Sequence, residues 1–336
     1  MHLRYFSRGI IRPSRFLSYL LPLFFLTGCG VPSFLVTPVA NSNKLKEELV
    51  QPGQGFFPKK VAVIEVEGLL LNARSGGFLQ PTENDVSLFV QQMEKAEKDP
   101  DVRAVVLRVN SPGGTVSASD AMYATVLRFR EKTGKPIVAS TQDLAASGAY
   151  YVSCAADKIV AQPTSLVGSI GVIFNTFDIS GTLAKIGARS EAIKSGPLKD
   201  LASPFKPLSD PERQVMQSLV NEFYQRFKDI VKTRRNLDDA TLAAVSDGRV
   251  FSGLQAVQLG LADQAGQLPE AITLAKQLAN VPNAKVVLYK RPYGYSGSIY
   301  AQGQSPHPQA VNVIQLNLLP STALLPSGFY YLWEPQ

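Results

Sequence analysis

The stretch Val102-Arg-Ala-Val-Val-Leu-Arg-Val109, followed at once by Asn110-Ser-Pro-Gly-Gly114, decides the fold class of this chain. Its β-branched and other apolar residues are typical of a buried strand, and the glycine pair predicts a loop after it. A helix is expected next, running to about Glu131, with Ser117 or Ser119 as its N-cap. A strand, a loop and a helix in this order form the first half of a parallel βαβ unit.

The same alternation continues on both sides of this stretch. Apolar β-branched runs predict strands at 61–66, 136–140 and 159–161. Residues 84–98 carry apolar side chains at spacings of three and four, which predicts a helix, and a short helix is expected from Ser147. We therefore predict an α/β fold in which helices cover a largely parallel sheet.

The residues after 210 predict a mainly helical C-terminal part. Apolar side chains recur every four residues from Val215 to Phe227, which indicates one long helix packed on the sheet or on another subunit. The remaining expected elements are helices at 238–245, 253–259 and 269–279 and a strand at 285–289.

The composition excludes several classes of function. Among 336 residues the formal net charge is +7, but residues 1–28 hold four arginines and no acid, so the remainder carries 7 − 4 = +3. A nucleic-acid-binding surface is therefore not indicated. The histidines are His2 and His307 and the cysteines are Cys29 and Cys154, too few for a structural zinc site. A Ser-His-Asp triad would have to recruit His307 from a segment rich in proline, glutamine and serine.

The N-terminus has the pattern of an export signal. Residues 1–15 are basic, and the apolar stretch at 17–26 is too short to span a bilayer. Leu26-Thr27-Gly28-Cys29 looks like the lipobox of bacterial lipoproteins, which implies cleavage before Cys29 and acylation of its sulfur. An uncleaved signal anchor is the alternative. We therefore expect a signal peptide at 1–28, a tether at 29–58, and a lipid-anchored protein of the bacterial cell envelope with its folded part on the non-cytoplasmic side.

Lipidation of Cys29 would leave Cys154 without a partner for a disulfide within the chain. The neighbours of Cys154 are small and apolar, so we interpret it as a packed hydrophobic residue rather than a reactive thiol.

Three short segments carry residues suited to acyl transfer. The glycine pair at 113–114 lets backbone amides approach a ligand and could form an oxyanion hole. Ser147 has small neighbours that leave room for a substrate carbonyl. Lys199 could act as a base if Pro197 and Leu198 bury it, because burial lowers the pKa of a lysine. Taken singly, these segments have plainer interpretations: a common turn, a helix N-cap and a solvated lysine.

Taken together, the segments resemble the signal peptide peptidase A family of serine–lysine proteases, over roughly residues 60–290. The matching passages are Asn110-Ser-Pro-Gly-Gly114, Ser147-Gly-Ala-Tyr-Tyr151, Ala156-Asp-Lys-Ile159, Gly168-Ser-Ile-Gly-Val172, Lys194-Ser-Gly-Pro-Leu-Lys-Asp200 and Asp247-Gly-Arg-Val250. The resemblance implies a crotonase/ClpP-like α/β spiral of βαβ units, with a peptidase domain at 59–290. It also implies that the active site is completed in a homo-oligomer, a ring such as an octamer.

The same resemblance implies the role of each site residue. Ser147 would be the nucleophile and Lys199 its general base. Gly114 would donate its amide to the oxyanion, and Ser169 would orient the Lys199 amine. Neither a metal nor an organic cofactor is required, and the expected substrates are released signal peptides and other hydrophobic peptides.

Two other functions are compatible with the sequence. The chain could be a non-catalytic oligomeric envelope scaffold on the same fold, or a crotonase-like acyl-CoA enzyme, although an export signal separates it from the CoA pool. Residues 291–336 are expected to form a C-terminal tail. Its aromatic end at 330–333 suggests that it docks in a hydrophobic groove.

Overall fold

The computed structural model describes residues 45–72, 84–291 and 327–333. They belong to one compact unit, residues 43–336. Among these residues, no helix combines the length and the apolar character needed to cross a bilayer. The expected signal peptide, Cys29 and most of the expected C-terminal tail lie outside the described residues.

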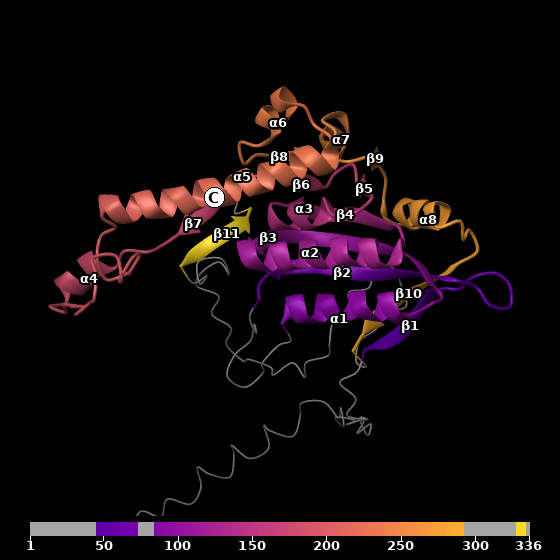
Figure 1. Cartoon of the computed structure of the whole chain (residues 1–336), viewed down its shortest axis with the longest axis horizontal. Helices are drawn as coiled ribbons and strands as arrows, with labels where there is room; N and C mark the ends of the chain where they lie inside the picture. The colour runs from indigo at the N-terminus through magenta and orange to yellow at the C-terminus, as the bar shows by residue number, and fades with distance from the viewer. Residues whose placement is uncertain (1–44, 73–83, 292–326, 334–336) are drawn as a thin grey trace, which may run out of the picture. The chain divides into compact units, whose positions relative to one another are not determined.

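A largely parallel sheet forms the centre of this unit (Figure 1). Its strand order is β1-β10-β2-β3-β4-β5-β9, and the β1–β10 pair is antiparallel. The strands are β1 (Lys46–Gln51), β2 (Lys60–Leu70), β3 (Val102–Thr115), β4 (Ile137–Ala146), β5 (Lys158–Ala161), β9 (Gln264–Ala265) and β10 (Lys285–Lys290). The predicted α/β alternation is therefore confirmed.

Helices cover both faces of the sheet because its strands alternate their side chains. Val61 and Val63 of β2 lie in a core with α8 (Leu268–Leu278), whereas Ala62 and Ile64 lie in a larger core on the opposite face. Two helices, α1 (Asp85–Lys98) and α2 (Val116–Thr133), run side by side over that larger core (Figure 1). Both faces of the central sheet are thus buried under helices, as expected for parallel strands.

Strands β3 and β4 continue past the central sheet, each after a shift of register. The end of β3 pairs with β11 (Gly328–Leu332), which pairs in turn with β7 (Ile173–Asn175). The end of β4 pairs with β6 (Leu166–Gly168), which pairs with β8 (Val250–Ser252). These extensions bring the two strand ends that carry the candidate site residues side by side.

Two expectations for this region are wrong. Residues 113–114 end strand β3 instead of forming a loop, because β2 and β11 pair with them. The N-cap of α2 is Thr115, whose Oγ1 accepts a hydrogen bond from the N–H of Ala118 at 3.3 Å, rather than Ser117 or Ser119.

The C-terminal part is helical, as predicted, and its long helix α5 (Asp210–Arg235) buries Phe227 and Val231 in the larger core. The shorter helices are α3 (Gly148–Ser153), α4 (Ser180–Lys185), α6 (Asp239–Val245) and α7 (Gly253–Gln258). Helix α4 belongs to residues 176–206, here called the arm. Figure 1 shows α4 near the start of α5, at the end away from α6 and α7.

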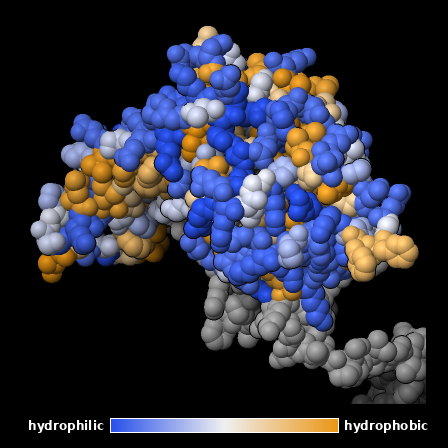
Figure 2. Space-filling model, turned by 45° about the vertical axis from the view of Figure 1, so that its right-hand side comes forward, coloured by the Kyte–Doolittle hydropathy of each residue, from blue (hydrophilic) through white to orange (hydrophobic). Residues whose placement is uncertain are grey.

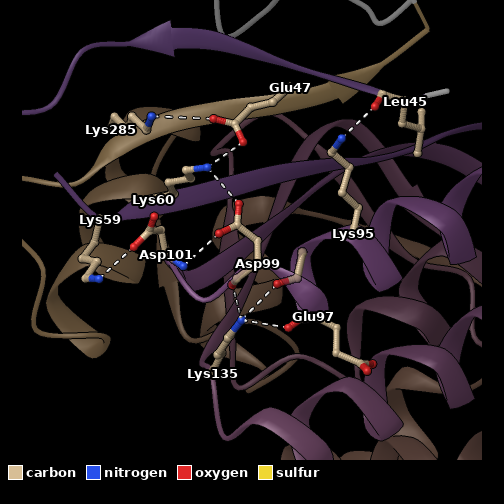
Figure 3. Close-up of polar contacts among 11 residues, drawn as sticks. Leu45, Glu47, Lys59, Lys60, Lys95, Glu97, Asp99, Asp101, Lys135 and Lys285 are labelled. Carbon is tan, nitrogen blue, oxygen red and sulfur yellow. Dashed lines mark hydrogen bonds and ion pairs between the residues drawn. The ribbon is translucent and has the colours of Figure 1, made fainter. Parts of the chain in front are cut away.

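Part of the range predicted as a tether forms regular structure, because β1 (Lys46–Gln51) lies inside it. This edge strand has few apolar residues, so ion pairs and backbone pairing hold it instead. Lys60 Nζ contacts Glu47 of β1 at 2.7 Å and Asp99 at 2.8 Å (Figure 3). Lys95 Nζ donates to the carbonyl of Leu45 at 2.7 Å, which secures the start of β1 (Figure 3).

Candidate active site

Ser147 forms the sharp turn between β4 and α3. Its φ of 53° and ψ of −116° are a sparsely populated combination for a residue with a side chain. The turn is held by the Ser147 N–H, which donates to the carbonyl of Gly168 at 2.7 Å, and by the Ser147 carbonyl, which accepts from Tyr151. Although Ser147 precedes a helix, its side chain makes no capping hydrogen bond. Ser147 is thus the N-cap residue of α3 by position only, and a strand-to-helix elbow of this kind is suited to a nucleophile.

Glycines allow the backbone of β3 to approach Ser147 closely. A Cβ on Gly113 would lie 2.6 Å from the nitrogen of Gly148, the residue after Ser147. A Cβ on Gly114 would lie 1.9 Å from the carbonyl oxygen of Leu70, so no side chain fits there. The Gly113 N–H donates to Ser111 Oγ at 3.0 Å. The structure thus brings Gly113 close to the residue that follows Ser147.

Ser169 lies next to the same turn. It is 6% exposed, with a φ of 50°, and its N–H donates to the carbonyl of Arg249 at 2.8 Å. The carbonyl of Gly168, the residue before Ser169, accepts the hydrogen bond from the Ser147 N–H, so this bond links the two serine-containing segments. Ser169 also lines a cavity of about 660 Å³ between α5 and the extended strands, together with Leu332 and Trp333.

Strand β11 crosses the site directly. Tyr331 pairs with Gly114, and the Trp333 N–H donates to the carbonyl of Pro112 at 2.9 Å. The carbonyl oxygen of Tyr331 lies 2.0 Å from where a Cβ on Gly113 would be and 3.1 Å from where one on Gly148 would be. A peptide carbonyl of the chain itself therefore lies close to both Gly113 and Gly148, the residue after Ser147.

The Tyr331 side chain fills an aromatic pocket. Its ring stacks on Tyr151 with centroids 5.0 Å apart, and the ring of Phe227 lies 4.9 Å away. Its hydroxyl donates to the carbonyl of Phe223 at 2.8 Å. Burial raises the pKa of Tyr331 above its usual range. The aromatic residues at 330–333 suggested a docked tail, but no signal in the sequence indicated that Tyr151 and Phe227 line its pocket.

The Tyr151 ring is itself held by a polar group. Its hydroxyl donates to Asp120 Oδ1 at 2.6 Å, and Arg226 Nη2 contacts the same carboxylate at 2.7 Å. Burial, with Asp120 adding to it, raises the pKa of Tyr151 well above its usual range. One wall of the pocket is therefore the uncharged side chain of Tyr151 on α3, which Asp120 of α2 and Arg226 of α5 hold in place.

Lys199 is not brought to Ser147 within one copy of the chain. It lies exposed on the arm, and among the described residues no hydrogen bond or ion pair involves its side chain. Leu198 beside it is 40% exposed, so the enclosure expected from Pro197 and Leu198 is absent in a single chain. Its neighbour Asp200 is paired with Lys194 at 2.7 Å and Lys206 at 2.9 Å.

Cys154 is a packed side chain, as its neighbours suggested. It is 2% exposed, and burial raises the pKa of its thiol to about 12. Groups of three or more histidine, cysteine or acidic residues that could hold a metal ion do not occur within the described part of the chain.

Comparisons with known proteins relate the chain to proteases. A model described as peptidase family S49 matches residues 129–282, and one described as Clp protease matches residues 59–167. An Enterococcus faecium protein named "Putative signal peptide peptidase SppA" is 34% identical over 249 residues, which cover 74% of this chain and 72% of that protein.

Two longer relatives share the same region. Protease 4 of Haemophilus influenzae is 36% identical over 66% of this chain but only 35% of its own length. The chloroplastic serine protease SPPA of Arabidopsis thaliana is 36% identical over 59% of this chain and 29% of its own. The Clp protease match, together with the observed sheet, confirms the predicted Clp-like α/β fold.

Proposed function

Because the chain belongs to peptidase family S49, we propose that it is a serine endopeptidase of the bacterial envelope, with Ser147 as nucleophile and Lys199 as general base. Its substrates are hydrophobic peptides, above all signal peptides after their release. The observation that carries this proposal is strand β11, a peptide segment whose Tyr331 carbonyl already lies beside the elbow of Ser147.

A substrate peptide would add to the edge of β3 in the same way as β11. Main-chain pairing with β3 supplies affinity without regard to sequence, and side-chain pockets supply preference. The pocket of Tyr331, lined by Tyr151 and Phe227, favours a large apolar or aromatic side chain. The substrate preference is therefore expected to be hydrophobic, in keeping with signal peptides.

The proposal also includes an oxyanion hole. Backbone amides of Gly114 and Gly148 would stabilise the negative charge that develops on the scissile carbonyl oxygen. Gly148 is an addition to the sequence-based proposal, since the amide after a nucleophile on such an elbow commonly serves this purpose. Loss of one such donor typically costs about 100- to 1000-fold in kcat.

Lys199 would come from a neighbouring copy of the chain. The arm that carries it exposes several large apolar side chains, seen as orange patches on the left of Figure 2. They are Phe177, Ile179, Ile186, Ile193, Leu198 and Phe205. Packing the arm against a second copy would cover these residues and enclose Lys199, and loss of hydration would then lower its pKa. In a closed ring of copies, each arm would pack against the next copy of the chain.

The reaction proceeds by acyl transfer. Neutral Lys199 accepts the proton of Ser147 as Oγ attacks the scissile carbonyl, and the resulting ammonium gives that proton to the leaving amine. Water then attacks the acyl-enzyme, again with Lys199 as base, and frees Ser147 Oγ. Ser169, which lines the adjacent cavity, would accept or donate a hydrogen bond that orients the lysine amine. A lipid on Cys29 would hold the enzyme at the membrane.

The test is hydrolysis of a fluorogenic hydrophobic peptide by residues 41–336 across pH 6–10. Ser147→Ala and Lys199→Ala should each abolish cleavage, whereas the exposed controls Ser117→Ala and Lys98→Ala should keep it. A mixture of the two inactive variants should regain activity if one copy supplies the serine and another the lysine.

Two results would overturn the proposal. Equal rates in all variants would mean that the site is elsewhere. Absence of cleavage and of labelling by a serine-directed fluorophosphonate in a correctly assembled protein would favour the non-catalytic scaffold.

A further inference from the structure

The loop between β1 and β2 exposes two adjacent phenylalanines. Phe56 is 99% exposed and Phe57 is 94% exposed, whereas the next most exposed phenylalanine of the described residues, Phe177, reaches 50%. Figure 1 draws this loop in indigo, extending beyond the sheet. Two large apolar rings fully in water are costly, so an apolar partner is expected.

The loop presents these rings from a fixed base. The Gln54 N–H donates to the carbonyl of Asn283 at 3.0 Å. At Gly53 a Cβ would lie 2.5 Å from Pro58 Cβ and 2.6 Å from the Asn283 oxygen, so the base is tightly packed. Gly55, by contrast, has a φ of +92° and open space around it. The two phenylalanine side chains therefore project into solvent from a tightly packed loop base.

The chemistry of the loop suits a lipid bilayer better than a protein partner. Residues 51–58 contain no charged side chain, so their entry into an apolar medium would not require charge to be desolvated. Two phenylalanines can bury about 300–500 Å², which is less than the roughly 800 Å² per partner of a stable protein interface. A narrow apolar projection fits a fluid membrane interface, into which phenylalanine and other large apolar side chains of surface-bound proteins insert.

The membrane is also within reach. Lys95 and Lys60 secure the start of β1 to the body of the protein (Figure 3), and the expected lipid site, Cys29, precedes Leu45 by 45 − 29 = 16 residues. Such a tether spans at most about 55 Å. A single tether leaves the orientation of the folded part open, and a second contact at another point of its surface would restrict that orientation.

We propose that Phe56 and Phe57 insert into the membrane interface and form a second, non-covalent contact that orients the catalytic unit. This inference rests on the proposed lipid anchor for its location but not on the proposed chemistry. It assigns to the loop a lipid-binding role that is separate from the candidate active site.

The test measures binding of residues 43–336, which contain both hydrophobic cores, to phosphatidylcholine vesicles by co-sedimentation. Phe56→Ser/Phe57→Ser should lower the partition coefficient at least about 10-fold, because two buried rings are removed. The matched control Leu254→Ser/Leu278→Ser alters exposed leucines on α7 and the end of α8 and should bind as the parent does. High salt should leave binding unchanged, since no charge is involved.

A second measurement uses the full-length chain in vesicles, with Phe57→Cys labelled by an environment-sensitive fluorophore; Cys154 is buried and should not react. A blue shift of the label's emission supports insertion. An unshifted emission, equal binding by the double serine variant, or a change of oligomer mass instead of vesicle binding would overturn the proposal. Hydrolysis of a soluble peptide without vesicles should be equal in all variants, so failure of this inference is distinct from failure of the proposed function.

Discussion

The backbone N–H of Ser147 donates to the carbonyl of Gly168 at 2.7 Å, and this bond joins the ends of β4 and β6. It holds the serine in a backbone conformation that few residues with side chains adopt. The Tyr331 carbonyl oxygen comes close to the neighbouring Gly148 and to Gly113 of β3, since a Cβ on these glycines would lie 3.1 Å and 2.0 Å from it. The geometry of the site thus depends on contacts between backbone segments.

Gly148→Ala should lower both activity and stability. The added Cβ would lie 2.2 Å from Ser119 Oγ, an overpacking that typically costs about 1–3 kcal/mol. Adding Ser119→Ala should recover much of the loss of stability, because the next contact from that side chain, Ser119 Cβ, is at 3.2 Å. Thermal unfolding and kcat/KM of the single and double variants check this. A double variant no more stable than Gly148→Ala would contradict the contact.

Deletion of residues 327–336 should raise kcat/KM for added peptides several-fold while lowering thermal stability. The deletion frees the edge of β3, but it also removes Tyr331, whose ring is fully buried. A synthetic peptide of residues 327–333 should then inhibit the shortened protein competitively. Unchanged kinetics after deletion would show that β11 does not lie in the path of the substrate.

The aromatic ring of Tyr331 should contribute more to the stability of the fold than its hydroxyl does. Tyr331→Ala should cost about 3–5 kcal/mol of unfolding free energy, because it empties the space between Tyr151 and Phe227. Tyr331→Phe removes the hydrogen bond to the Phe223 carbonyl and should cost only about 0.5–1.5 kcal/mol. Chemical denaturation of the two variants measures both values. Similar losses would mean that the ring is not tightly packed.

Acid should loosen the arm before the core unfolds. Hydrogen bonds from Lys194 and Lys206 lower the pKa of Asp200 to about 2, and Lys206, followed by Ser209, lowers the pKa of Glu212 to about 2. Carboxylates with depressed pKa values stabilise the fold fully above their ordinary values, 3.8 and 4.5, and lose that contribution as pH falls toward 2.

Amide hydrogen exchange of residues 190–212 between pH 5 and pH 2 checks this prediction. Exchange, corrected for its intrinsic pH dependence, should accelerate in this segment and remain slow in β2 and β3. Asp200→Asn/Glu212→Gln should show a much smaller change over the same range. Equal acid sensitivity in the variant would assign the effect to other carboxylates.

Cys154 should be inert to alkylation in the folded protein at pH 8. A pKa of about 12 leaves almost no thiolate, and the side chain is 2% exposed. Iodoacetamide labelling followed by mass spectrometry should detect modification only after denaturation. Fast labelling under native conditions would mean that α3 opens readily, together with the Ser147 turn that precedes it.

The sequence by itself determined the class of the fold and pointed to a candidate nucleophile, Ser147. The β-branched run at 102–109 and the helical spacings around it encode local structure, and such patterns are readable because burial on one face imposes a period. The small residues around Ser147 and the glycine pair at 113–114 indicated a close backbone approach, which the structure contains.

Only the tertiary structure decided which segments meet. Residues 113–114 become the end of a strand because β11, more than 200 residues later, pairs with them; no local signal encodes such a contact. The short strand β1 was missed since ion pairs rather than apolar side chains hold it. The separation of Lys199 from Ser147 was also invisible in the sequence, because distance across a fold depends on how its elements pack, not on the residues that each element contains.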